Sequence, residues 1–200
     1  MDDELEIEFV YQCTHSLGEG VEGLVVAATA LAHQCRKAVH SLLQQTQVRK
    51  TYHAVTFGGP ATEEGTIDAP IGRRPLPSLL RCVSEEGKPS VTEYKVLEWL
   101  GNLCKLELRP ITGRTHQLRV HCAYMGYPIL GDPQYGSEES KAFSKELGIP
   151  HQLLCAKSLE LTHPITGEKL RLMSEMEINN YKFNISNGIC RSGEFSLLQR

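Results

Sequence analysis

Two neighbouring stretches in which apolar and polar residues alternate constrain the fold of this chain more than any other feature. They cover residues 91–99 and 103–109, and Gly101 and Asn102 lie between them. Alternation is typical of strands with one buried face, and a short loop of Gly and Asn is typical of an antiparallel hairpin. The side chains expected on the buried face of the second strand are Cys104, Leu106 and Leu108. The sequence therefore predicts an antiparallel hairpin with one face in the core.

Other periodic stretches predict a mixed chain in which antiparallel strands dominate. Further strands are expected at 24–28, at 52–57, near 66–67, and in a second hairpin formed by 153–161 and 169–172. An apolar stripe predicts a helix over 30–45, and a shorter helix is expected between a Thr115 cap and Gly126. The expected fold class is α+β, with a mixed, mainly antiparallel sheet and a few flanking helices.

Composition bounds the size and the class of the protein. A chain of 200 residues with 40% hydrophobic and 22% charged residues fits one globular domain. No run approaches the roughly 20 apolar residues that span a bilayer, and the first residues are acidic where a signal peptide is basic. The seven cysteines form no C-x-x-C pair, which disfavours a disulfide framework or a zinc knuckle. We expect a cytoplasmic protein without membrane contact or bound metal.

The charge distribution permits local binding of nucleic acid. A formal net charge of -3 argues against a protein that coats nucleic acid without specificity, because that activity needs many cations facing the phosphates. Acidic residues crowd the first eight positions, whereas arginines gather in two groups. These are Arg73, Arg74 and Arg81, and then Arg109, Arg114 and Arg119. We expect any basic groove to be confined to these two groups, with solvated surface charges as the alternative.

One long motif carries a family resemblance. It reads Arg109-Pro-Ile-Thr-Gly-Arg-Thr-His-Gln-Leu-Arg-Val-His121 and continues as Gly126-Tyr-Pro-Ile-Leu-Gly-Asp-Pro-Gln-Tyr-Gly136. Upstream, residues 48–55, 69–73 and 87–94 fit the same family order. The chain thus resembles RNA pseudouridine synthases of the RluA type from about His15 to about Met173. The resemblance implies their catalytic fold.

The chain departs from the family pattern near its start. The family opens this region with H-R-L-D-x-x-T-S-G, whereas here His15 begins the sequence His-Ser-Leu-Gly-Glu-Gly-Val-Glu-Gly. Gly18 therefore stands at the position of the family's catalytic aspartate, and Ser16 stands for its arginine. Nothing before His15 resembles the N-K-P-type segment of the family. The expectation is a synthase fold whose N-terminal part is missing.

The resemblance implies isomerisation of uridine to pseudouridine in ribosomal or transfer RNA, without a cofactor. A carboxylate at position 18 would act near the anomeric carbon, and glycine cannot do so. By the same resemblance Tyr52 contacts the uracil, Arg119 pairs with that carboxylate and Leu118 packs under the base. The substrate-binding residues carried over with Leu118 are Arg114, which could hold a phosphate, together with His116 and Arg73.

Several side chains have competing interpretations. Glu19 and Glu22 are the nearest acids to position 18, but neighbouring residues of an extended segment face opposite ways, so neither is expected to replace the aspartate. Asp132 is expected to form a turn and to have a structural role. His116 and His121 are five residues apart, which is not the spacing that gives two metal ligands on one helix face.

The expected domain organisation has three parts. Residues 1–14 form an acidic N-terminal segment, 15–176 form the synthase-like catalytic domain, and 177–200 form a C-terminal extension without sustained periodicity. Three hypotheses follow: an active synthase, a catalytically silent RNA-binding module (a pseudoenzyme), or a fragment of a longer synthase. Because Gly18 has no carboxylate, it favours the silent RNA-binding module over the active synthase. The sequence carries no signal for an oligomeric state.

Overall fold

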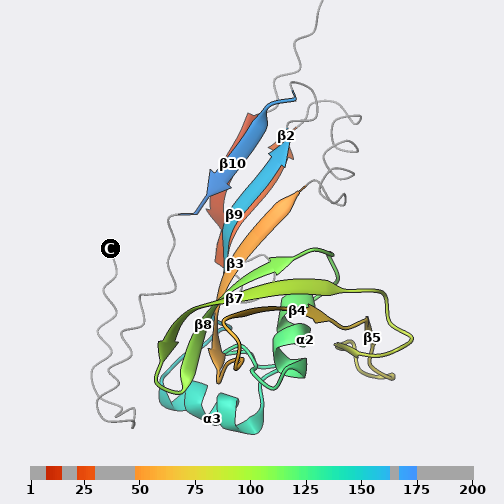
Figure 1. The fold of residues 1–200 in the computed structure, drawn as a ribbon, viewed down its shortest axis with the longest axis vertical. Helices are drawn as coiled ribbons and strands as arrows, with labels where there is room; N and C mark the ends of the chain where they lie inside the picture. The colour runs from red at the N-terminus through yellow and green to blue at the C-terminus, as the bar shows by residue number, and fades with distance from the viewer. Residues whose placement is uncertain (1–7, 15–21, 30–47, 163–166, 175–200) are drawn as a thin grey trace, which may run out of the picture.

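The computed structural model describes residues 8–14, 22–29, 48–162 and 167–174, and most of its strands belong to one sheet. Figure 1 shows this long twisted sheet with two short helices near one end. Its strand order is β1-β2-β9-β3-β8-β7-β4, and β10 pairs with β9. The bounds are β1 Glu8–Thr14, β2 Glu22–Thr29, β3 Arg49–Phe57, β4 Glu64–Asp68, β7 Val91–Leu100, β8 Leu103–Pro110, β9 Leu154–Thr162 and β10 Lys169–Met173.

Strand pairing confirms the predicted fold class. Neighbouring strands of the sheet are antiparallel, except that β2 runs parallel to β9 over two residue pairs. The two predicted hairpins are present as β7–β8 and β9–β10. The predicted strand at 24–28 lies within β2, and that at 52–57 lies within β3. The helix expected at 30–45 and the C-terminal extension lie outside the described residues.

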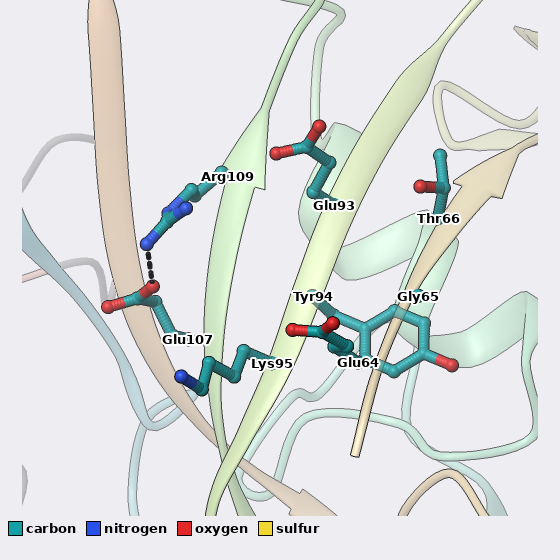
Figure 2. Close-up of a pocket in the computed structure, with 8 residues that line it drawn as sticks. All are labelled: Glu64, Gly65, Thr66, Glu93, Tyr94, Lys95, Glu107 and Arg109. Carbon is teal, nitrogen blue, oxygen red and sulfur yellow. Dashed lines mark hydrogen bonds and ion pairs between the residues drawn. The ribbon is translucent and has the colours of Figure 1, made fainter. Parts of the chain in front are cut away.

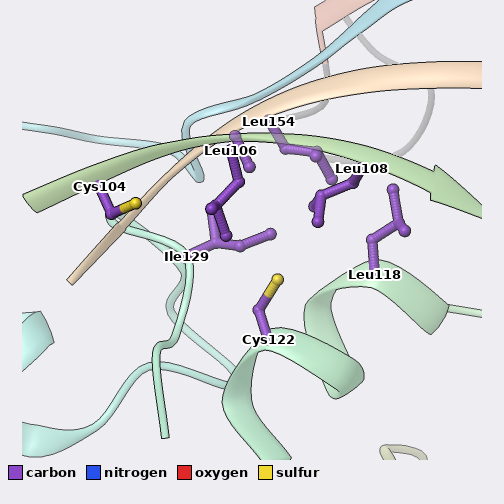
Figure 3. Close-up of a cluster of buried hydrophobic side chains, with 8 residues drawn as sticks. Cys104, Leu106, Leu108, Leu118, Cys122, Ile129 and Leu154 are labelled. Atoms are coloured by element: carbon purple, nitrogen blue, oxygen red, sulfur yellow. The ribbon is translucent and has the colours of Figure 1, made fainter. Parts of the chain in front are cut away.

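The β7–β8 hairpin contributes one face to the main core, as its alternating pattern predicts. Cys104, Leu106 and Leu108 are buried and pack against helix α2, Gln117–Tyr124. Figure 3 shows Leu118 and Cys122 of α2 pointing toward these β8 side chains. Burial of each large aliphatic side chain contributes about 1.5–3 kcal/mol, so this cluster fixes α2 against the sheet.

A second helix, α3 (Glu138–Glu146), was not predicted from the sequence. Its N-cap is Ser137, whose side chain accepts a hydrogen bond from the Ser140 backbone amide. The buried residues of this helix are Ser140 and Ser144, so it lacks the apolar stripe by which a helix is recognised in a sequence. Its apolar contacts come from Phe143, which packs partly buried against Phe57, and from Leu147 just after the helix, which joins a core cluster with Val55 and Leu130.

Two further differences concern short segments. The stretch interpreted as loops between Pro60 and Gly87 also contains β5 (Ile71–Arg73) and β6 (Arg81–Val83), which form a separate two-stranded sheet. Strand β1 lies in the segment interpreted as an acidic N-terminal region, and it pairs with β2 in the main sheet. The domain boundaries themselves stay a prediction. Among the described residues, no helix has the length and apolar character needed to cross a membrane.

Candidate active site

The start of α2 is fixed by the side chain of Gln117. Its Oε1 accepts hydrogen bonds from Thr112 Oγ1 at 2.8 Å and from the Arg114 backbone amide at 2.9 Å. Its Nε2 donates to the Val91 carbonyl at 2.9 Å and to Thr92 Oγ1 at 3.0 Å. The amide thus uses both of its donors and both of its acceptor positions. Gln117 holds the turn before α2 against β7, a role that sequence interpretation missed.

The predicted Thr115 cap is wrong. His116 occupies the N-cap position with φ 57° and ψ 21°, and no side chain caps the helix there. A left-handed backbone at a non-glycine residue is uncommon. The helix begins at Gln117, one residue later than a Thr115 cap would require, and the Gln117 side chain satisfies the amide of Arg114.

His116 belongs to a small polar group between α2 and β6. Its Nδ1 lies 2.9 Å from the Tyr135 hydroxyl, which accepts a hydrogen bond from the Arg81 backbone amide at 3.1 Å. Burial lowers the pKa of His116, and the charges of Arg119 and Arg81 lower it further while Asp132 opposes them. The imidazole is therefore neutral at neutral pH, and its Nδ1 accepts a hydrogen bond from the Tyr135 hydroxyl.

Arg119 is buried and is held by the Gly-Asp segment of the motif. Its Nε donates to Asp132 Oδ2 and its Nη2 to Asp132 Oδ1, both at 2.7 Å, and Nη2 also donates to Gln134 Oε1 at 3.0 Å. The guanidinium lies 4.8 Å from the centre of the Tyr135 ring. The resemblance pairs Arg119 with a carboxylate at position 18, whereas in the structure Asp132 supplies its carboxylate partner.

Asp132 also forms the turn predicted for it. Its Oδ1 accepts hydrogen bonds from the backbone amides of Gln134 at 2.9 Å and Tyr135 at 3.0 Å. Its side chain is fully buried. The same carboxylate therefore closes the turn and binds the guanidinium.

Tyr52 and Leu118 contact one core cluster, although 66 residues separate them in the chain. Leu118 is a buried member of the cluster of Ala54, Leu106 and Leu108, and Tyr52 packs against it half-buried. Burial raises the pKa of Tyr52, so its phenol is protonated at neutral pH. The structure thus brings together two of the residues predicted to contact the base, and Arg119 follows Leu118 directly on α2.

The region around position 18 is located only through its neighbours. Gly18 and Glu19 lie outside the described residues, and of Glu22 only the backbone position is described. In the sheet, Gly23 of β2 is paired with Ala156 of β9, which is paired with Tyr52 on its other side. Adjacent strands lie about 4.8 Å apart, so the start of β2 lies roughly 10 Å from the Tyr52 backbone.

The second group of arginines does not form one patch. Leu108 faces α2, so Arg109 projects from the opposite face of the sheet and donates to Glu107 Oε1 at 2.6 Å. Arg114 instead lies in the turn before α2, where its Nε donates to the Pro89 carbonyl at 3.1 Å. Arg73 is exposed at the end of β5, directly opposite Arg81 of β6. Arg81, whose charge acts on His116, and Arg114 thus lie near the start of α2, and Arg73 lies opposite Arg81.

A groove of about 240 Å³ lies beside the outer strands of the sheet. Figure 2 shows charged side chains of both signs from β4, β7 and β8 around it. Its charged lining residues are Glu64, Glu93, Lys95, Glu107 and Arg109. None of the residues predicted to bind substrate lines this groove. Its acids outnumber its cations by three to two, which disfavours a nucleic-acid phosphate there.

His121 has a structural position. Its Nε2 donates to the Ala69 carbonyl at 3.0 Å, and its Nδ1 accepts a hydrogen bond from Thr92 Oγ1 at 2.9 Å. Burial is the main cause that lowers the pKa of His121, against smaller opposing effects of the Ala69 hydrogen bond and of Asp68. Both ring nitrogens are used within the core. Among the residues that the structure describes, no group of three or more potential ligands is placed to hold a metal ion.

Comparison with known proteins gives the family of this fold and site. A sequence model described as RNA pseudouridylate synthase matches residues 2–124, a match that starts ahead of His15. An uncharacterized RNA pseudouridine synthase of Chloroflexus aurantiacus is 43% identical over 76% of this chain and 46% of its own length. The ribosomal large subunit pseudouridine synthase D of Vibrio parahaemolyticus is 39% identical over 78% of this chain and 49% of its own length. The chain thus spans about half the length of these curated relatives.

The solved structures agree with this result. The human RNA pseudouridylate synthase domain containing 1 structure matches with a TM-score of 0.67 and 30% identity, over 83% of this chain and 68% of that chain. Human RNA pseudouridylate synthase domain containing 4 matches with a TM-score of 0.61 and 29% identity, over 78% of this chain and 68% of that chain. The sequence motifs, the sheet and these matches agree, and the chain belongs to the RNA pseudouridylate synthase family, in its RluA-type branch.

Proposed function

We propose that this chain binds a uridine of structured ribosomal RNA at the face formed by β3 and α2, and that glycine at position 18 impairs its isomerisation step. The observation that carries the proposal is the contact of Tyr52 and Leu118 with one cluster, with Arg119 next to Leu118. We also propose that the protein is cytoplasmic and that transfer RNA is the alternative substrate. The relatives named for the ribosomal large subunit favour ribosomal RNA as the first substrate to test.

The chemistry of each side chain supports a role in binding a base. A uridine must leave its stack to reach such a site, at a cost of a few kcal/mol that contacts within the site must offset. Leu118 is buried in the cluster beneath the proposed site and keeps 7% of its surface exposed. The protonated phenol of the half-buried Tyr52 can donate a hydrogen bond to the base or accept one from it. The Arg119 guanidinium, paired with Asp132, supplies an oriented hydrogen-bond donor at the adjacent helix position.

In this proposal the residue at position 18 is needed for turnover but not for RNA binding. Breaking the glycosidic bond needs a group that acts as nucleophile or base near the anomeric carbon, and a glycine side chain has no such group. Asp132 does not replace it, since both of its oxygens are occupied by Arg119 and by the turn. We therefore expect RNA binding to survive in this chain and turnover to be very low.

The arginines near α2 supply the phosphate contacts in this proposal. Arg73 and Arg81 lie on opposed strand positions, and Arg114 is half-buried in the turn before α2. Each contact between an arginine and a phosphate adds about one unit to the slope of log affinity against log salt concentration. A protein with a net charge of -3 can bind RNA in this way only through such a local group.

The test combines tritium release from C5-labelled uridine in RNA with salt-dependent RNA affinity. The wild-type chain is expected to bind with a clear salt slope and to release little tritium. Gly18→Asp is expected to raise release by at least about a hundredfold, within the range of a positioned acid–base or nucleophilic group. Gly18→Asn is the matched control, because it adds similar bulk without a carboxylate. Robust release by the wild-type chain would refute the impaired-turnover part of the proposal.

Tyr52→Phe tests the second expected contact in the Gly18→Asp background. The change removes only the phenol oxygen and leaves the ring packed against the cluster. We expect a loss of turnover with little change in thermal stability. Failure of the wild-type chain to bind RNA, or binding without a salt slope, would reject the proposed function as a whole.

A further inference from the structure

We propose that Asp132 is the positioning residue for Arg119, so that the guanidinium is oriented for RNA whatever residue occupies position 18. This inference rests on the proposed RNA-binding function. Asp132 is 13 residues from Arg119 and binds it along one edge, with Nε donating to Oδ2 and Nη2 donating to Oδ1. A bidentate pair of this kind fixes the plane of the guanidinium as well as its position.

The carboxylate is itself held rigidly. Oδ1 accepts hydrogen bonds from the backbone amides of Gln134 and Tyr135, so the turn fixes the orientation of Asp132 before Arg119 binds it. A further hydrogen bond connects this turn to α3, because the Gly131 amide donates to Ser144 Oγ at 2.9 Å. Gly131 has φ 78°, and a Cβ there would lie 2.0 Å from the His151 carbonyl oxygen. These contacts leave the carboxylate little freedom to follow a displaced arginine.

One nitrogen of the guanidinium is left to face a ligand. Nε and Nη2 donate to Asp132 and Gln134, whereas Nη1 has no hydrogen-bond partner among the described residues. The Arg119 side chain keeps about a tenth of its surface exposed. The Tyr135 ring lies on its face at 4.8 Å and restricts its tilt. The geometry thus presents the two Nη1 protons as the donors available to an RNA phosphate or a uracil carbonyl.

The direction in which RNA affinity changes when Asp132 is neutralised distinguishes a positioning role from a purely electrostatic effect. Asp132 is an anion close to the proposed RNA site, so its neutralisation would tighten RNA binding if only charge mattered. If Asp132 orients Arg119, neutralisation instead weakens binding, because the guanidinium loses its fixed plane. Asp132→Asn suits this test, since the remaining oxygen can still accept from the two turn amides.

The experiment measures the affinity of the full chain for a labelled ribosomal RNA stem-loop that contains the uridine, by fluorescence anisotropy at constant salt. Asp132→Asn is expected to weaken binding roughly tenfold, a 1.4 kcal/mol change. Glu138→Gln removes one negative charge from an exposed site on α3 and is expected to change affinity less than about twofold. Gln134→Ala, at an exposed position of the same turn, is expected to weaken binding by about twofold to threefold.

A double variant shows whether Asp132 acts through Arg119. In an Arg119→Met background, Asp132→Asn is expected to cause no further loss of affinity. Wild-type or tighter binding by Asp132→Asn, or an additive loss in the double variant, overturns this inference and leaves the proposed function intact. Loss of stability does not explain the expected pattern, because Gln134→Ala removes a hydrogen bond to the same guanidinium from an exposed position. Absence of RNA binding by the wild-type chain is a different result, which rejects both proposals.

Discussion

His121 illustrates at the scale of one residue how the core fixes a protonation state. Its Nε2 faces a carbonyl oxygen, which can only accept, and its Nδ1 faces a hydroxyl that already accepts from Gln117. The neutral tautomer with hydrogen on Nε2 satisfies all of these groups at once. If Nδ1 were also protonated, its proton would point at the Thr92 hydroxyl. That hydroxyl would then have to turn its own proton away or lose the hydrogen bond from Gln117.

This arrangement predicts a pH dependence of stability. The pKa of His121 is lowered from 6.5, chiefly by burial, and that of His116 is lowered in the same direction. Between the lowered pKa and 6.5 the unfolded chain binds more protons than the folded chain, so the free energy of unfolding falls as pH falls below about 6.5. Urea unfolding at pH 7.5 and pH 5.5 measures this effect. His121→Gln is expected to be less stable than wild type but to show a smaller pH dependence, and an unchanged dependence would contradict the assignment.

The partner of Arg119 was within the sequence motif but was not recognised. The motif contains both Arg119 and Asp132, and the turn role of Asp132 was predicted correctly. Sequence spacing gave no reason to join residues on a helix and in a later turn, because that contact depends on how the chain returns after Gly126. A buried charge needs a partner, so a search for the nearest unassigned acid in the motif could have found it.

At the scale of elements, α3 supports the site although it contributes little to the apolar core. Ser144 Oγ accepts from the Gly131 amide at 2.9 Å and donates to the Ser140 carbonyl at 2.6 Å. Through these bonds a helix with polar buried positions holds the turn that carries Asp132. The sequence could not reveal this helix by apolar periodicity, whereas β7 and β8 were predictable because their alternating residues are divided between the core and the outer face.

Ser144→Ala is therefore expected to destabilise the fold by about 1–3 kcal/mol, because it leaves the buried Gly131 amide without its partner. Alanine has the higher helix propensity, so a loss of stability would come from the hydrogen bond rather than from the helix. Lys145→Ala, at an exposed neighbour on the same helix, is the control and is expected to change stability by less than about 0.5 kcal/mol. Chemical denaturation of the three proteins measures the difference, and equal stabilities would remove α3 from the support of the site.

At the scale of the whole molecule, the sheet separates two charged surfaces. Arg73, Arg81 and Arg114 lie around α2 and β6, whereas the groove on β4, β7 and β8 carries three glutamates with Lys95 and Arg109. The sequence showed Arg109 and Arg114 as one group. Arg109 lies on the outer face because side chains alternate along β8, and the turn that follows carries Arg114 to the start of α2. The grouping of cations therefore could not be predicted from sequence proximity.

This separation yields a prediction that compares two arginines five residues apart. Arg114→Gln is expected to weaken RNA binding about threefold to tenfold and to reduce the salt slope by about one unit, because a phosphate contact is lost. Arg109→Gln removes the same charge, but Arg109 is paired with Glu107 on the other surface and is expected to leave both quantities nearly unchanged. Anisotropy titrations at several salt concentrations measure both. Because net charge changes equally in the two variants, equal losses would mean that RNA responds to overall charge, and that the α2 side is not the surface it contacts.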